Sequence, residues 1–235
     1  MVWFHAYGSY MSKYAPVVAH FTEQGYEVVG FDMRGFGESE GERSLIADRR
    51  DWIDDAQHFL SKTHEWQLEL RGYALPWIAY GYSMGGCYAL GTYLHLERLP
   101  RLQAQFKSMV LVVPNLGMGD YWWGRFPPDL QYRHGYLRTK YIDSHLAGWP
   151  ALMSKRDRHD ELHYRGRVLA PTLWMVHEQI LSNDKQAHKV KLPLHVSVSE
   201  HDPIVSSEKT RNFFNRTASA VKTLKEYDGK HDLLA

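Results

Sequence analysis

Short, continuously apolar runs alternate along this chain with segments in which apolar residues recur every three or four positions. The runs are rich in β-branched and aromatic residues and are typical of strands buried on both faces of a parallel sheet. They cover residues 2–5, 27–32, 77–82, 108–114, 192–199 and 221–227. The periodic segments predict amphipathic helices over residues 11–25, 44–61, 84–94 and 206–215. This alternation predicts an α/β fold, with a mostly parallel sheet and helices on both of its faces.

The alternation breaks down between residues 115 and 190. An aromatic, turn-rich stretch at 121–128 is followed by short helical pieces, among them 171–181. We interpret 115–190 as a lid, or cap, inserted between two parts of one core, residues 1–114 and 191–235. The aromatic side chains could line an acyl-chain pocket or anchor the lid to the core, and the sequence leaves both readings open.

Composition narrows the class of protein. The 235 residues suffice for one sizeable α/β domain with an insertion, and 44% apolar with 23% charged residues is typical of a globular chain. The net charge of +1 gives no electrostatic argument for a nucleic-acid partner. No apolar run reaches the ~18 residues of a membrane span, and the first residues do not resemble a signal peptide. With Cys87 as its single cysteine, the chain is predicted to be cytoplasmic or membrane-peripheral.

The most informative motif is Gly81-Tyr82-Ser83-Met84-Gly85. An apolar strand precedes it and a helix follows, which is the context of a nucleophile elbow. In such a sharp turn a side chain at either glycine position would collide with the neighbouring strand or helix. Ser83 is therefore the expected nucleophile, and the N–H of Met84 is expected to point toward an oxyanion.

A serine nucleophile needs a base, usually histidine, and a carboxylate that orients it. In a sheet of this kind the expected chain order is serine, acid, histidine. Asp202 follows the strand at 192–199, and His231 follows the strand at 221–227, so both loops open at the edge where Ser83 lies. His201, Asp228 and Asp232 are adjacent competitors that spacing alone does not exclude.

The second oxyanion donor is expected from the loop after the first strand, where a backbone N–H suffices and Tyr7 is the best placed residue.

A metal site is the main rival explanation. His159 and His163 are four residues apart, but Glu161 falls one position too late for the zinc motif H-E-x-x-H. Neighbouring arginines favour a solvated surface, so no metal is expected. Cys87, on the helix behind the elbow, fits core packing better than a nucleophile's role.

Four segments together resemble the α/β-hydrolase fold, in particular its monoacylglycerol lipase and lysophospholipase branch, of the serine aminopeptidase S33 type. They are HAYG at 5–8, DMRGFGESEG at 32–41, GYSMGG at 81–86, and DP at 202–203 with GKH at 229–231. The resemblance implies the triad Ser83, Asp202 and His231 and an oxyanion hole formed by Tyr7 and Met84. It also implies hydrolysis of single-chain lipid esters through an acyl-serine, without a cofactor.

The chain departs from that pattern near the expected head-group site. Ala6 replaces a glycine, and Ser9, Lys13 and Tyr82 occupy positions where the lipases often have Glu, Arg and His. These three are the expected substrate contacts, and the departures leave the head group open. The family also has two strands before the segment at 2–5 and a helix after His231. Without them, we expect the strand at 27–32 to be an exposed edge and His231 to lie on a fraying tail.

The sequence thus predicts a serine ester hydrolase that acts on a small lipid ester, with peripheral membrane contact through the lid and no nucleic-acid partner. A binding protein of the same fold without catalytic activity, or a truncated fragment, is the first alternative. An acyltransferase or a peptidase using the same triad is the second.

Overall fold

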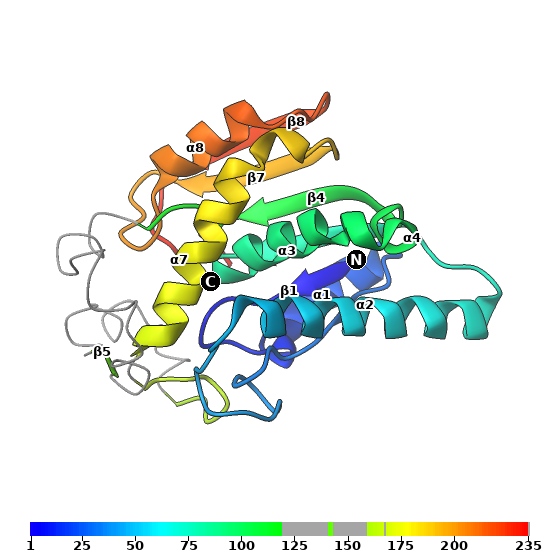
Figure 1. Ribbon diagram of the computed structural model, residues 1–235, viewed down its shortest axis with the longest axis horizontal. Coiled ribbons are helices and arrows are strands. Elements are labelled where there is room, and N and C mark those ends of the chain that lie inside the picture. Colours follow the sequence, from blue (N-terminus) through cyan, green and yellow to red (C-terminus); the bar gives the residue numbers. More distant parts are fainter. Residues whose placement is uncertain (119–140, 143–158, 167, 235) are drawn as a thin grey trace.

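The computed structural model describes residues 1–118, 141–142, 159–166 and 168–234. The aromatic stretch at 121–128 lies outside these residues. Six strands form one sheet in the order β2-β1-β3-β4-β7-β8, and every pairing is parallel (Figure 1). The strands are β1 (Val2–Phe4), β2 (Val29–Gly30), β3 (Trp77–Tyr82), β4 (Phe106–Val112), β7 (Leu194–Ser199) and β8 (Lys222–Tyr227). All six predicted strands are present, and β2 lies at the sheet edge as expected.

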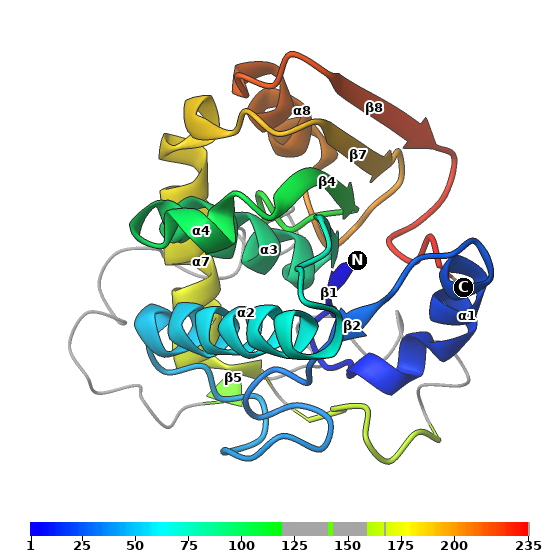
Figure 2. The same ribbon diagram turned by 90° about the vertical axis from the view of Figure 1, so that its right-hand side faces the viewer.

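The helices cover both faces of this sheet, as the alternation predicted (Figure 2). In Figure 2, α2, α3 and α7 lie on one side and α1 lies on the other, next to the C-terminal end of the chain. The longer helices are α1 (Ala15–Glu23), α2 (Arg49–Arg71), α3 (Met84–His95), α7 (Ala170–Lys185) and α8 (Ser207–Arg216). The short elements are α4 (Pro100–Gln103), the 3-10 turns η1 (Met11–Tyr14), η2 (Leu96–Arg98) and η3 (Ala187–Lys189), and an antiparallel pair of β5 (Tyr141–Ile142) with β6 (Val168–Leu169).

The helix predicted over 44–61 begins later and runs further than its apolar periodicity indicated. The Asp48 carboxylate accepts a hydrogen bond from the N–H of Arg50, which caps the N-terminus of α2. At the other end Gly72 adopts a left-handed conformation, with φ +78°, that terminates the helix. Capping chemistry, which the periodicity does not contain, therefore set both boundaries.

Two apolar layers sandwich the sheet. The larger lies under α2, α3, α7 and α8 and includes Trp77 and Ala79 of β3. The smaller lies under α1 and includes Tyr80 and Tyr82 of the same strand. Alternation along β3 thus sends neighbouring side chains to opposite faces. Leu233, near the end of the chain, packs against the smaller layer.

Helix α7 lies within the segment interpreted as the lid, yet it packs like a core helix. Met175, Val176 and Ile180 are buried in the larger apolar layer. Asn183 donates from Nδ2 to the carbonyl of Cys87 on α3 at 2.9 Å, deep inside the protein. The lid boundary at residue 190 stays a prediction, but α7 itself covers the helix that carries the elbow.

Among the described residues, no helix has both the length and the apolar character needed to cross a membrane.

Candidate active site

The elbow is built by steric constraint on the backbone. Ser83 has φ +55°, a conformation that non-glycine residues adopt rarely. A Cβ on Gly85 would lie 2.1 Å from the carbonyl oxygen of Phe4, and one on Gly81 would lie 2.6 Å from Cα of Gly86. Both contacts are with backbone atoms, which cannot move aside. The two glycines are therefore required for the strand, turn and helix to approach one another this closely.

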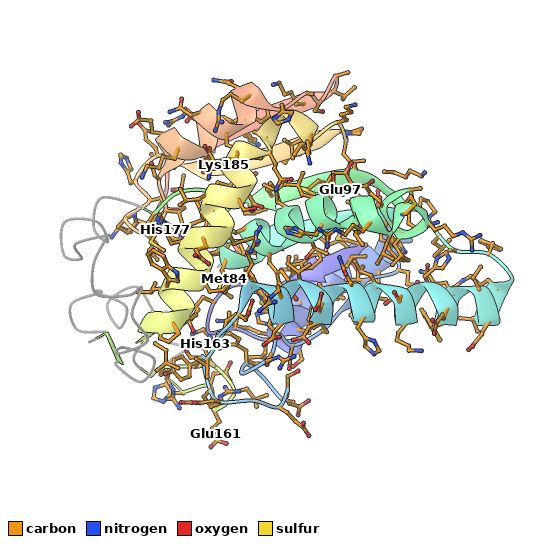
Figure 3. The ribbon with its side chains drawn as sticks, viewed as in Figure 1. Met84, Glu97, Glu161, His163, His177 and Lys185 are labelled. Carbon is orange, nitrogen blue, oxygen red and sulfur yellow. The ribbon has the colours of Figure 1, made fainter. Side chains whose placement is uncertain are left out.

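Hydrogen bonds hold the Ser83 backbone from two sides. Its N–H donates to the carbonyl of Val112 at 3.0 Å. Its carbonyl accepts from the N–H groups of Gly86 and Asn115, each at 2.9 Å. Met84 is the first residue of α3, so its N–H lies at the N-terminal end of that helix, where backbone donors favour negative charge. Figure 3 shows Met84 in the interior, close to α7.

The structure brings Ser83, His231 and Asp202 into one chain of hydrogen bonds. Nε2 of His231 lies 2.8 Å from Oγ of Ser83, and Nδ1 lies 2.7 Å from Oδ2 of Asp202. A carboxylate only accepts, so Nδ1 must carry the ring proton. In the neutral ring Nε2 then carries no proton and accepts the hydrogen bond from the serine hydroxyl. This is the arrangement that a general base for Ser83 requires.

The three side chains are well shielded from water. The side chains of Asp202 and His231 are 1% and 14% exposed, and Ser83 is 7% exposed. The second carboxylate oxygen of Asp202 accepts from the N–H groups of Ile204 and Val205 at 2.8 and 3.0 Å. These bonds fix the carboxylate plane, so that Asp202 can orient the imidazole.

The competitors named from the sequence have other partners. His201 and Asp228 face each other at 3.5 Å, and both side chains are largely exposed. Asp232 accepts a hydrogen bond from the hydroxyl of Tyr82. The hydrogen bonds around Ser83 are made by His231 and Asp202, whereas these three residues have the other partners given above.

The loop after β1 is anchored by a buried histidine. The ring of His5 accepts at Nε2 from the N–H of Met33 at 2.9 Å, and its Nδ1–H donates to the carbonyl of Ala6 at 2.8 Å. Burial lowers the pKa of His5 to about 4, which keeps the ring neutral at physiological pH. Gly8, at φ +75°, closes a turn in which the N–H of Ser9 donates to Ala6. His5 therefore ties this loop to the glycine-rich loop after β2.

Tyr7, predicted to supply an oxyanion donor, lies in this same turn. Its side chain is partly buried against the larger apolar layer, and its hydroxyl is hydrogen-bonded to Ser44. Burial raises the pKa of Tyr7 above its ordinary value. The side chain thus packs into the protein, and the expected role uses the backbone N–H alone. The close approach of the Phe4 and His5 carbonyls to Gly85 places this loop against the elbow.

The three expected substrate contacts lie in different surroundings. Ser9 is buried, and its hydroxyl has no hydrogen-bond partner among the described residues. Nζ of Lys13 lies 3.4 Å from Nδ1 of His163, on the segment 159–166. Tyr82 is also buried and points to the face of the sheet covered by α1. Contact of these residues with substrate stays a prediction.

His159 and His163, the two histidines of the rejected zinc motif, lie in separate environments. His159 is exposed, whereas His163 is buried and contacts Lys13, a cation that would repel a metal ion. Figure 3 shows Glu161 at the outer edge of the molecule and His163 further inside. Elsewhere in the described residues, Glu200, His201 and Asp228 could converge on an ion. All three are exposed, and such groups gather at surfaces without a metal.

Comparison with known proteins identifies the family of this chain. The family model for "Serine aminopeptidase, S33" matches residues 1–235. The chain is similar to Phospholipase YtpA of Bacillus subtilis, with 23% identity over 96% of this chain and 84% of the relative. It is 26% identical to an uncharacterized abhydrolase domain-containing protein of Dictyostelium discoideum over 97% of this chain, but spans only 23% of that relative's length.

Solved structures show the same fold. The monoacylglycerol lipase of Paleococcus ferrophilus superposes with a TM-score of 0.72 at 20% identity, over 99% of this chain and 85% of the lipase. A soluble variant of the monoglyceride lipase of Saccharomyces cerevisiae superposes with a TM-score of 0.66 at 18% identity. The match covers 97% of this chain and 76% of the lipase. The fold, the strand-turn-helix at Ser83 and the family model that matches residues 1–235 all indicate the same family. The chain belongs to the serine aminopeptidase S33 family of hydrolases and has the α/β-hydrolase fold.

Proposed function

We propose that the protein is a serine hydrolase that cleaves carboxylic esters of single-chain lipids, either monoacylglycerols or lysophospholipids. The observation that carries the proposal is the hydrogen-bonded chain from Ser83 through His231 to Asp202. It lies at the carboxyl ends of β3, β7 and β8, the edge of a parallel sheet where substrates bind.

The reaction proceeds in two halves. Oγ of Ser83 attacks the ester carbonyl while Nε2 of His231 takes the hydroxyl proton. The tetrahedral intermediate collapses to an acyl-serine, and His231 gives that proton to the departing alcohol. Water then attacks the acyl-serine with His231 again as the base, which releases the fatty acid and restores Ser83. Asp202 stabilises the imidazolium in both halves and holds the ring in its productive tautomer.

The negative oxygen of each intermediate needs two donors. The N–H of Met84 lies at the start of α3, so the helix dipole adds to its effect. The N–H of Tyr7 is the proposed second donor, supplied by the loop that His5 anchors. Loss of one such donor typically lowers kcat by ~10²–10³-fold.

The lipid substrate is proposed from three similarities. Two similar structures are a monoacylglycerol lipase and a monoglyceride lipase, and one similar sequence is a phospholipase. Monoacylglycerols and phospholipids share an ester bond between an acyl chain and a glycerol-based polar part. We further propose that the segment 115–190 acts as the lid and makes peripheral contact with the membrane that delivers the substrate.

The deciding experiment is covalent labelling with a fluorophosphonate probe, which reacts with an activated serine. Wild type and Cys87→Ala should be labelled, and Ser83→Ala should not. Cys87 is the matched control because it lies on the same helix, is fully buried, and has its pKa raised by that burial. Folded wild-type protein that resists the probe would reject the serine hydrolase mechanism.

A substrate panel then tests the lipid class. Fatty-acid release should be faster from a monoacylglycerol or a lysophospholipid than from a short water-soluble ester at equal concentration. Faster cleavage of an aminoacyl amide would favour a peptidase instead. Ester product formed preferentially with added alcohol would favour acyl transfer.

A further inference from the structure

The residue immediately before the nucleophile reaches the chain segment that carries the base. The hydroxyl of Tyr82 lies 2.9 Å from Oδ1 of Asp232 and 3.2 Å from the carbonyl oxygen of His231. We propose that Tyr82 and Asp232 form a latch that positions His231 against Ser83. Tyr82 is then a positioning residue, and this inference rests on the proposed serine hydrolase function.

The hydroxyl is a dependable donor at this place. Tyr82 is 7% exposed, so its hydroxyl must find a partner within the protein. Burial first, and the nearby Asp232 carboxylate second, raise the pKa of Tyr82 well above its ordinary value. The phenol therefore keeps its proton throughout the physiological range. A hydrogen bond from a neutral donor to a carboxylate is among the stronger ones in proteins.

The phenol ring supports the imidazole as well. The rings of Tyr82 and His231 lie 6.1 Å apart between centroids at an interplanar angle of 28°, in an offset stack. Tyr82 also contacts Tyr14 in a T-shaped arrangement, with ring centroids 6.2 Å apart. The hydroxyl of Tyr14 accepts from the N–H of Ala6 at 3.3 Å. These contacts join the histidine segment, the residues after β8 that include His231, to the loop that carries Tyr7.

The histidine segment needs such a support. Before His231, the carbonyl of Gly229 accepts from the N–H of His201 at 3.1 Å and from the hydroxyl of Ser199. These bonds hold the chain two residues ahead of the base. Tyr82 attaches His231 and Asp232 to β3, because its single hydroxyl proton is shared between the Asp232 carboxylate, the nearer acceptor, and the carbonyl of His231. Asp202 restrains the ring, and the latch restrains the backbone from which the ring projects.

Strand alternation explains why the nucleophile's neighbour can do this. Successive residues of β3 point to opposite faces, so Tyr82 enters the layer beneath α1. Leu233 and Leu234 pack against that same layer. The end of the chain is therefore held on this face by apolar contact and by the Tyr82 hydroxyl together.

The test compares Tyr82→Phe with Tyr80→Phe. Both remove the hydroxyl of a buried tyrosine on the same face of the same strand, two positions apart. Tyr82→Phe should lower kcat and the rate of fluorophosphonate labelling by about 10- to 100-fold, the range for one hydrogen bond to a charged group, with little change in KM. Tyr80→Phe should keep the wild-type rate. Equal rates in the two variants, per folded molecule, would overturn the latch.

Asp232 supplies the second arm of the test. Asp232→Ala should match Tyr82→Phe, and the double variant should be no slower than either single variant, because the two residues act as one unit. Asp232→Asn keeps an acceptor oxygen and should restore activity to within about threefold of wild type. Additive losses in the double variant would show two independent effects and reject the latch.

Limited proteolysis, which does not depend on catalysis, distinguishes failure of this inference from failure of the proposed function. Lys230 is exposed and directly precedes His231, so trypsin can report on release of the segment. Tyr82→Phe should accelerate cleavage after Lys230, and Tyr80→Phe should not. If wild type is not labelled by the probe, the hydrolase function fails, and the catalytic role of the latch fails with it. If labelling is normal in wild type and cleavage after Lys230 is unchanged in Tyr82→Phe, the latch alone fails.

Discussion

The proposed nucleophile, Ser83, and its proposed base, His231, are held by different means. Ser83 is fixed by the main chain around it: glycines that admit close approach, a strained φ, and backbone hydrogen bonds to β4 and the start of α3. His231 is fixed by side chains: the Asp202 carboxylate, the Tyr82 hydroxyl and the apolar contacts of the residues that follow. One half of the site is a property of the fold, and the other depends on a few particular side chains.

This difference predicts how each half fails. A change that disturbs the elbow must move strands, so it should appear as a loss of folding. A change that disturbs the histidine segment moves a few residues at the sheet edge, so it should appear as lost activity in a folded protein. Stability and activity measured on the same variants distinguish the two outcomes.

The largest effect is expected from Gly85→Ala. The added Cβ would meet the carbonyl oxygens of Phe4 and His5 at 2.1 and 2.5 Å, and neither can yield without shifting β1. We expect a loss of more than about 4 kcal/mol in the free energy of unfolding, measured by urea denaturation, or no soluble protein.

Gly91→Ala is its matched control on the same helix. Its Cβ would meet the amide end of the Gln179 side chain, which can move, so the loss should stay below about 2 kcal/mol. Equal losses in the two variants would contradict the backbone account of the elbow.

The next effect concerns pH and the loop after β1. The pKa of His5 is about 4 in the folded protein and about 6.5 in an unfolded chain. As pH falls from 6.5 to 4, the unfolded chain takes up a proton that the folded protein does not, so the free energy of unfolding falls. The loss should reach about 3 kcal/mol at pH 4 and stop growing below it.

Urea denaturation across this pH range measures that loss. His5→Asn should flatten the dependence, and His20→Asn, at an exposed position on α1, should leave it unchanged. A wild-type slope retained in His5→Asn would assign the acid sensitivity to other groups.

The smallest effect is expected from Leu233→Ala. Leu233 is only partly buried, so its truncation should lower the free energy of unfolding by about 1 kcal/mol. Activity should fall severalfold, because the segment that carries His231 loses part of its apolar anchor. Leu70→Ala, at a position 59% exposed on α2, should change neither quantity. Unchanged activity in Leu233→Ala would show that hydrogen bonds alone hold the segment.

The sequence predicted the features that depend on backbone geometry, namely the parallel sheet and the elbow. The alternation of apolar runs gave the parallel sheet, and Gly81, Ser83 and Gly85 identified the elbow before any coordinates. Chain order indicated Asp202 and His231, although spacing could not separate them from His201, Asp228 and Asp232. Those choices required the hydrogen bonds that the structure supplies.

The sequence did not predict contacts made by loops and ends. Tyr82, whose contact with substrate stays a prediction, is hydrogen-bonded to Asp232, and the sequence did not indicate this bond. One signal was present, because alternation along β3 places Tyr82 opposite the elbow helix. Alternation could not identify Asp232 as the partner of Tyr82, because the path of the residues after β8 depends on tertiary packing. The burial of α7 was missed because its periodicity does not say which surface it covers.

The order of strands in the sheet has a consequence for how activity arises during folding. Ser83 and His231 are separated by 148 positions, whereas His231 and Asp202 are separated by 29. Contacts between distant parts of a chain form slowly, because a long loop must close before they stabilise anything. A molecule whose base reaches its nucleophile must already have joined β7 to β4 and β8 to β7. Appearance of probe labelling during refolding should therefore lag behind helix formation and mark completion of the sheet.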